Sequence, residues 1–190
     1  MDSEQDLCRR LKAGDPEAFR SLVREYETPL FSFLCHRLGN RAEAEDAFAE
    51  VCVRIWRAIG DYRAQGRLKA WVFTIAHRCA LDRAEKARRR REDSMDAEDE
   101  AGRPLSEGLA SSEPGPEAEA AAQDERARIE RAIAALPEPQ KQVFLLREYG
   151  GLSFAEAADA MDCPLSTALA RMRYALGRLR AELEGLDAPR

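Results

Sequence analysis

The sequence predicts an all-α protein with two small helical domains joined by a flexible acidic linker. Three observations indicate this fold class: apolar residues recur at three- and four-residue spacing near both ends, the middle is acidic with scattered Pro and Gly, and charge is segregated along the chain. The expected domains are residues 1–91 and 126–190, with the linker at 92–125. Each domain can bury a modest core, whereas 190 residues exclude a large multidomain enzyme.

The net charge of −5 argues against a uniformly basic nucleic-acid binder, but it averages three different segments. Residues 1–91 carry 19 basic and 14 acidic side chains, residues 92–125 carry 1 and 12, and residues 126–190 carry 10 and 9. Either end can therefore still bind an anionic partner.

The first helix is expected to begin at Asp15, which can cap the helix while Pro16 occupies its first position. The Thr28-Pro29 pair repeats this start signal, so the segment forms either two helices or one helix kinked at Pro29. Gly39 supplies a C-terminal stop.

An amphipathic helix is expected over residues 42–59, where apolar side chains follow three-four spacing and charged side chains occupy the other faces. Gly60 ends this helix, and residues 61–67 form a polar loop. A further helix begins near Leu68 and runs into a basic stretch that ends at Arg91.

Residues 92–125 contain almost no large apolar side chains. Such a composition does not offset the entropy lost on ordering, so a flexible tether is expected. A tether of this kind would let the two domains sit well apart on a large partner.

The C-terminal segment has the pattern of a helix-turn-helix. Ser153 to Glu156 form a capping-box sequence that starts one helix, residues 162–165 make the turn, and Ser166 can cap a second, basic helix from Thr167 onward. This arrangement is typical of DNA binding, although any helical hairpin shares the pattern.

The second helix of this pair carries the candidate DNA-reading residues. Leu169 and Ala170 stand where the helix that enters the DNA groove often has polar side chains. Their apolar character favours contacts with phosphates over many hydrogen bonds to base edges. The candidate residues on these grounds are Arg171 and Arg173, near the start of the helix.

A second candidate nucleic-acid surface lies on the loop and helix that follow residue 61. Cations beside aromatic rings suit an unpaired strand, because bases stack on the rings while phosphates are neutralised. The alternatives are that the basic run only solvates a helix end and that Trp71 belongs to the core. The candidate residues of this pattern are Tyr62, Arg63, Arg67, Trp71, Arg78 and Arg83.

Other classes of function are not indicated by the sequence. It has no glycine-rich phosphate loop, nucleophile elbow or His-Glu metal motif, so neither enzyme activity nor a cofactor is expected. The Cys35-His36 and His77-x-Cys79 pairs lack zinc-site spacing, and five widely spaced cysteines fit reduced thiols. No apolar run reaches ~18 residues and the polar start lacks a signal segment, which predicts a cytoplasmic protein without membrane insertion.

The order of these parts resembles the extracytoplasmic-function (group IV) sigma factors of bacterial RNA polymerase. Three stretches look like that family's second conserved region: GDPEAFRSLVREYETPLFSFLCHRLG, AEDAFAEVCVRIWRAI and YRAQGRLKAWVFTIAHRCALDRAEKARRRR. A fourth stretch, ALPEPQKQVFLLREYGGLSFAEAADAMDCPLSTALARMRYALGRLR, looks like its fourth region.

The resemblance implies a protein that binds core RNA polymerase, directs it to promoters and helps to open them. In that family the amphipathic helix of the second region docks on the polymerase, a role that falls here on Asp46, Glu50, Arg54 and Arg57. The basic loop and its helix would meet the minus-ten element and capture an extruded base, a role that falls on residues 62–69, Trp71 and the helix from Thr74 to Arg83, including Lys69 and His77. The helix-turn-helix would read the minus-thirty-five element, a role that falls on residues 166–173, including Ser166, Thr167 and Ala170.

The sequence also departs from the family pattern, and two other functions stay open. Ala49 stands where the family usually has Gln, and Arg78 stands where it often has Asn. Ser166, Leu169 and Ala170 replace the commoner Gly, Lys and Ser at the start of the helix that would read DNA. The promoter sequence is therefore not predictable, and any sensing is expected from a separate anti-sigma factor. The alternatives are a stand-alone helix-turn-helix transcription regulator and a helical protein-binding adaptor.

Overall fold

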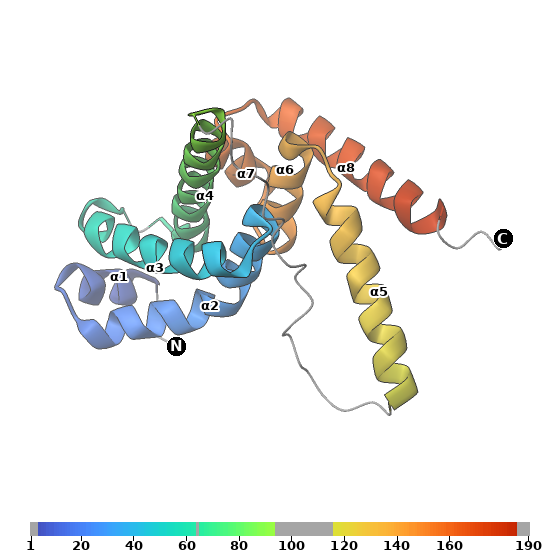
Figure 1. Cartoon of the computed structure of the whole chain (residues 1–190). Helices are drawn as coiled ribbons and strands as arrows, with labels where there is room; N and C mark the ends of the chain where they lie inside the picture. Colours follow the sequence, from blue (N-terminus) through green and yellow to red (C-terminus); the bar gives the residue numbers. More distant parts are fainter. Residues whose placement is uncertain (1–3, 64, 94–115, 186–190) are drawn as a thin grey trace.

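The computed structural model describes residues 4–63, 65–93 and 116–185, which form eight α-helices and one short 3-10 helix and contain no β-strand. The all-α prediction is confirmed. Figure 1 shows the helices gathered around one centre, with α5 and α8 extending away from it.

The chain begins with α1 (Glu4–Lys12) and α2 (Pro16–Leu38). Asp15 caps α2 by accepting hydrogen bonds from the backbone of Glu17 at 2.9 Å and of Ala18 at 3.4 Å. Gly39 ends α2 with a left-handed φ of 72° that few other residues adopt cheaply. Of the two arrangements that the sequence left open, the structure has one continuous helix with Pro29 inside it.

The sequence reading missed α1. The apolar pattern of this helix is short, because its buried side chains are only Cys8 and Leu11, which are 2% and 1% exposed. A helix of nine residues is not stable alone, so packing against α2 and the 3-10 helix is what holds it.

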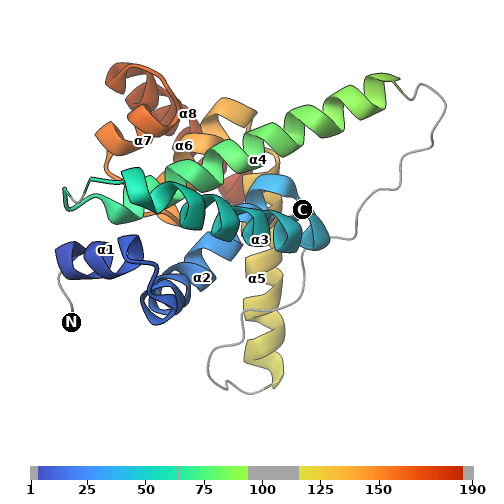
Figure 2. The same ribbon diagram turned by 90° about the vertical axis from the view of Figure 1, so that its left-hand side faces the viewer.

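The next elements are α3 (Arg41–Ala58), the 3-10 helix η1 (Ile59–Asp61) and α4 (Leu68–Asp93). Together with α2 they form a helical bundle, and Figure 2 shows α4 projecting beyond it. The expected helix boundaries near residues 42 and 59 and at Leu68 agree with the structure. The side chain of Asn40 caps α3 by accepting a hydrogen bond from the Glu43 backbone at 3.2 Å.

The C-terminal part contains α5 (Pro116–Ala134), α6 (Glu138–Glu148), α7 (Phe154–Ala160) and α8 (Leu165–Gly185). The capping box of α7 is present, with hydrogen bonds in both directions between Ser153 and Glu156. The start of α8 was predicted two residues late. The carbonyl of Pro164 accepts hydrogen bonds from the backbone of Thr167 and Ala168, so Ser166 lies within the first turn.

The linker prediction needs a correction at both of its ends. The helix α4 continues to Asp93, and α5 begins at Pro116, so residues 116–125 are helical. Pro at a first helical position followed by a run of Glu and Ala favours a helix more than the acidic composition suggested. Residues 94–115 of the expected linker lie outside the described residues.

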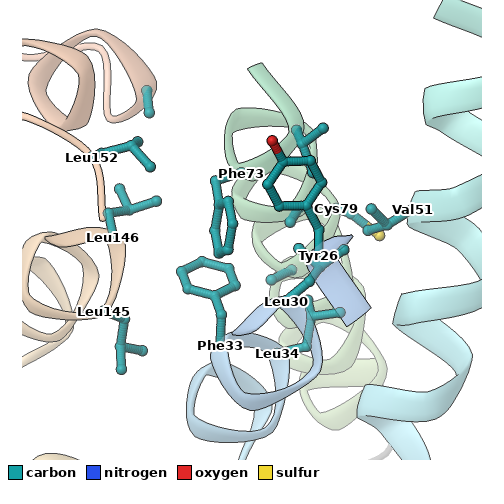
Figure 3. Close-up of a cluster of buried hydrophobic side chains, with 14 of the residues drawn as sticks. Tyr26, Leu30, Phe33, Leu34, Val51, Phe73, Cys79, Leu145, Leu146 and Leu152 are labelled. Atoms are coloured by element: carbon teal, nitrogen blue, oxygen red, sulfur yellow. The ribbon is translucent and has the colours of Figure 1, made fainter. Parts of the chain in front are cut away.

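The two halves of the chain share one hydrophobic core (Figure 3). Phe33 of α2 and Phe73 of α4 meet edge to face with centroids 5.6 Å apart, and they lie beside Leu145, Leu146 and Leu152. All five side chains are at most 1% exposed. The described helices are therefore packed together, not held apart on a tether.

Candidate nucleic-acid interface

The helix-turn-helix is built from α7, a tight turn and α8. A small core of Val143, Ala158, Ala168 and Met172 joins these helices to α6. Small alanines at two of these positions let the helix backbones approach closely. The packing fixes the face that α8 turns to solvent.

The structure places the predicted reader residues on the exposed and partly exposed sides of α8. Ser166 and Arg173 are exposed, and the guanidinium of Arg173 lies 5.6 Å from the ring centre of Tyr174. Thr167, Ala170 and Arg171 are half-buried. This face can contact phosphates and base edges in a groove.

The aromatic part of the second surface is less open than the sequence suggested. Tyr62 is only 7% exposed and its ring lies 4.9 Å from that of Trp71, which is partly buried. Burial and a hydrogen bond to Glu4 raise the pKa of Tyr62 to about 12. Of the two rings, Trp71 is the more exposed in this structure, and the predicted role of Tyr62 in DNA binding stays a prediction.

Glu4 organises this loop, and sequence reasoning missed it. Its carboxylate accepts hydrogen bonds from the Tyr62 hydroxyl and the Gly66 backbone, both at 2.9 Å, and from the Leu68 backbone at 3.3 Å. No local pattern could have revealed it, because Glu4 and Tyr62 are 58 residues apart.

The basic side chains of the second surface fall into two groups. Arg63, Arg67, Lys69 and Arg78 are exposed and can meet phosphates. Among the other predicted residues, the Thr74 hydroxyl donates a hydrogen bond to the Ala70 carbonyl of its own helix at 2.8 Å. Arg83 pairs with Glu43 and Glu50, both at 3.1 Å.

His77 does not belong to this surface. It is 3% exposed, and desolvation together with the charges of Arg37 and Arg78 lowers its pKa to about 4. Its Nδ1 atom has no hydrogen-bond partner within the described part of the chain. In the packed arrangement His77 is therefore not open to DNA, and its predicted contact with DNA stays a prediction for the opened protein.

The residues predicted to bind a protein partner lie along α3. Asp46 and Arg57 are exposed, whereas Glu50 and Arg54 are half-buried in an ion-pair network. Arg54 donates to Glu50 at 3.0 Å and to Asp82 at 2.8 Å. Burial alone would raise the pKa of Glu50, but the hydrogen bonds and charges of Arg54 and Arg83 outweigh it and lower this pKa.

The C-terminal half covers the beginning of α4. A Cβ atom placed on Gly150 would lie 3.1 Å from the ring of Phe73, and one placed on Gly151 would lie 2.5 Å from the ammonium of Lys69. Two polar contacts also join the N-terminal half to the C-terminal half. Arg37, whose side chain is 3% exposed, pairs with Glu138, and His36 hydrogen-bonds Tyr149 at 2.7 Å.

Neither a metal centre nor a membrane span emerges from the described residues. No group of three or more His, Cys, Asp or Glu side chains among them is arranged to hold an ion. None of the helices in the same residues is long and apolar enough to cross a bilayer.

Two family models match this chain. Sigma-70 region 2 matches residues 22–91, and Sigma-70, region 4 matches residues 126–179. The ECF RNA polymerase sigma factor SigK of Mycobacterium ulcerans is 32% identical over 94% of this chain and 92% of its own length. The RNA polymerase sigma-H factor of Pseudomonas aeruginosa is 29% identical over 90% of this chain and 89% of its own.

Two solved structures have a similar fold. The sigma factor RpoE of Bartonella quintana, in complex with the anti-sigma factor NepR, has a TM-score of 0.72 with 21% identity over 90% of this chain and 98% of its own. CnrH in complex with the cytosolic domain of CnrY has a TM-score of 0.70 with 21% identity over 98% of this chain and all of its own.

Proposed function

The chain belongs to the extracytoplasmic-function sigma factors of bacterial RNA polymerase, and from this premise we propose which of its residues bind the polymerase and the promoter. The protein is a transcription factor and not an enzyme. It binds core RNA polymerase, directs it to promoters and assists their opening. The observation that carries this function is the pairing of a region-2 bundle with a region-4 helix-turn-helix in one chain.

The division of labour follows the two ends of the chain. Residues 1–91 bind the polymerase and the minus-ten element, and residues 126–190 bind the minus-thirty-five element. The intervening residues 92–125 connect the two. The exposed helix face that carries Asp46 and Arg57 supports polymerase docking on α3, and the Glu50–Arg54 network stiffens that face.

On DNA, α8 enters the major groove and the start of α4 receives the opened strand. The reader residues on α8 are Ser166, Thr167, Ala170, Arg171 and Arg173. The minus-ten residues are Arg63, Arg67, Lys69, Trp71, Thr74 and Arg78, with Tyr62 and Arg83 as supports behind them. Exposed cations next to the Tyr62–Trp71 pair suit an unstacked base and its phosphates.

The packed arrangement must open before both promoter elements are bound. The names of the elements place them about 25 base pairs apart, which is roughly 85 Å of duplex at ~3.4 Å per base pair. Lys69, a minus-ten residue, lies against Gly151 of the minus-thirty-five domain. One compact unit with this contact does not span both elements, so the polymerase separates the domains.

An anti-sigma factor would stabilise the opposite, closed state. The structures of RpoE and CnrH contain the anti-sigma factor NepR and the cytosolic domain of CnrY, respectively. We expect a partner of this kind to hold the two halves of this chain together. Because RNA polymerase works in the cytoplasm, we place the protein there.

Run-off transcription with purified core polymerase on sheared genomic DNA tests the function. New start sites that share two spaced upstream elements are expected when the protein is added. The double variant Arg171→Glu, Arg173→Glu should abolish these starts, whereas Arg178→Glu, Arg180→Glu further along α8 should retain most of them. If both double variants gave the same output as wild type, the protein-binding adaptor would be favoured. Tight binding to duplex DNA without polymerase would favour a stand-alone regulator.

A further inference from the structure

One carboxylate from α1 holds the loop that leads into α4. Oε1 of Glu4 accepts hydrogen bonds from the Tyr62 hydroxyl and the Gly66 backbone N–H, both at 2.9 Å. Oε2 accepts from the Leu68 backbone N–H at 3.3 Å. Glu4 thus joins three points of the loop to one side chain from another helix.

Each of these contacts fixes a part of the predicted DNA-capture surface. Leu68 is the first residue of α4, whose first N–H groups lack partners within the helix, so a carboxylate there acts as a cap. Gly66 has a φ of 71°, a left-handed conformation that the hydrogen bond to its N–H helps to hold. The bond to Tyr62 keeps its ring 4.9 Å from that of Trp71.

The burial of α1 does not itself require this carboxylate. Cys8 and Leu11 supply the buried apolar contacts of the helix. The Sigma-70 region 2 match begins at residue 22, so α1 and Glu4 lie outside the segment that the family model covers. Nothing in that match assigns Glu4 a role.

We propose that Glu4 is a positioning residue for promoter opening. It pre-organises Tyr62, Gly66 and the N-terminus of α4 so that Trp71 and the neighbouring cations receive the extruded base without first ordering the loop. Pre-organisation of this kind lowers the entropy lost on binding. The inference rests on the proposed role of this loop at the minus-ten element.

The test separates promoter opening from initial binding. Holoenzyme is assembled from core polymerase and the full chain, and 2-aminopurine in the minus-ten element reports opening. Glu4→Ala should slow opening about tenfold, equivalent to about 1.4 kcal/mol, because three hydrogen bonds are lost. Affinity for core polymerase and for duplex carrying only the minus-thirty-five element should stay unchanged.

Three further variants distinguish positioning from a loss of fold. Glu4→Gln retains an acceptor oxygen and should recover part of the opening rate. Tyr62→Phe should slow opening less than Glu4→Ala, and adding it to Glu4→Ala should cost little more, since both remove the same hydrogen bond. Glu27→Ala, which removes an exposed carboxylate from α2, should open promoters at the normal rate.

Two results would overturn the inference. One is a normal opening rate for Glu4→Ala. The other is an equal loss of opening, polymerase affinity and minus-thirty-five binding, which would make Glu4 a residue of general stability. Failure of the proposed function looks different, because wild-type holoenzyme would then produce no opening signal at all.

Discussion

Replacing Glu138 should shift the protein from the packed arrangement toward separated domains. Glu138 pairs with Arg37, whose side chain is only 3% exposed and whose Nε lacks a hydrogen-bond partner among the described residues. Removing one member of a buried ion pair typically costs about 3–5 kcal/mol. The Glu138 side chain is 50% exposed, and separation of the domains rehydrates Arg37, so we expect about 1–2 kcal/mol for Glu138→Gln.

That difference corresponds to a roughly 5- to 30-fold shift in the ratio of closed to open protein. Small-angle scattering measures it directly, since a compact chain of this length has a radius of gyration of about 16 Å and an open form is larger. Glu148→Gln, at the exposed far end of α6, is the matched control. If Glu138→Gln and Glu148→Gln both scatter like wild type, Arg37–Glu138 does not hold the halves together.

Three other predictions concern pH, capping and salt. The unfolding free energy should fall as pH drops from about 6.5 to 4, by up to about 3 kcal/mol, because the pKa of His77 is about 4 in the fold and the unfolded chain takes up the proton first. Urea titrations at each pH should show this slope in wild type. Burial also lowers the pKa of His36, so a smaller slope is expected to remain in His77→Asn, and a slope as steep as that of wild type would contradict the prediction. Ser153→Ala removes the cap of α7 and should lower the free energy of unfolding by about 1 kcal/mol in the same assay. An unchanged free energy of unfolding would mean that the capping box is redundant. For holoenzyme binding to minus-thirty-five DNA, the slope of log K against log salt concentration should become less negative by about 2 in the double variant Arg171→Glu, Arg173→Glu. An unchanged slope would mean that neither residue contacts a phosphate.

Structural features that depend only on residues close together in the sequence could be predicted. Asp15 before Pro16, Gly39 after Leu38, and Ser153 three residues before Glu156 each place a cap within one turn of its helix. Such signals depend on local hydrogen bonds and backbone freedom only. The choice between one and two helices at Pro29 could not be made, because packing on both sides of the proline decides it.

Features that join distant residues could not be predicted. The hydrogen bond between His36 and Tyr149 spans 113 residues, and the bond between Tyr62 and Glu4 spans 58. Periodicity reports which face of a helix is apolar but not which helix will cover it. For this reason the sequence does not reveal that His77, which the family resemblance places on the DNA surface, is only 3% exposed in the packed fold.

The contact between the two halves and the proposed minus-ten surface use the same part of α4. Lys69 faces Gly151, and Phe73, one turn further, faces Gly150 and the leucines of the C-terminal half. Separating the domains therefore exposes the part of the Phe73 ring that faces the C-terminal half, while Phe33 of α2 still covers another part. Because full burial of a phenylalanine is worth about 1.5–3 kcal/mol, this exposure costs a part of that amount before any DNA contact is made. The proposed polymerase-docking residues Asp46 and Arg57 on α3 stay exposed in the packed arrangement, so we expect polymerase to bind first and supply the free energy of opening.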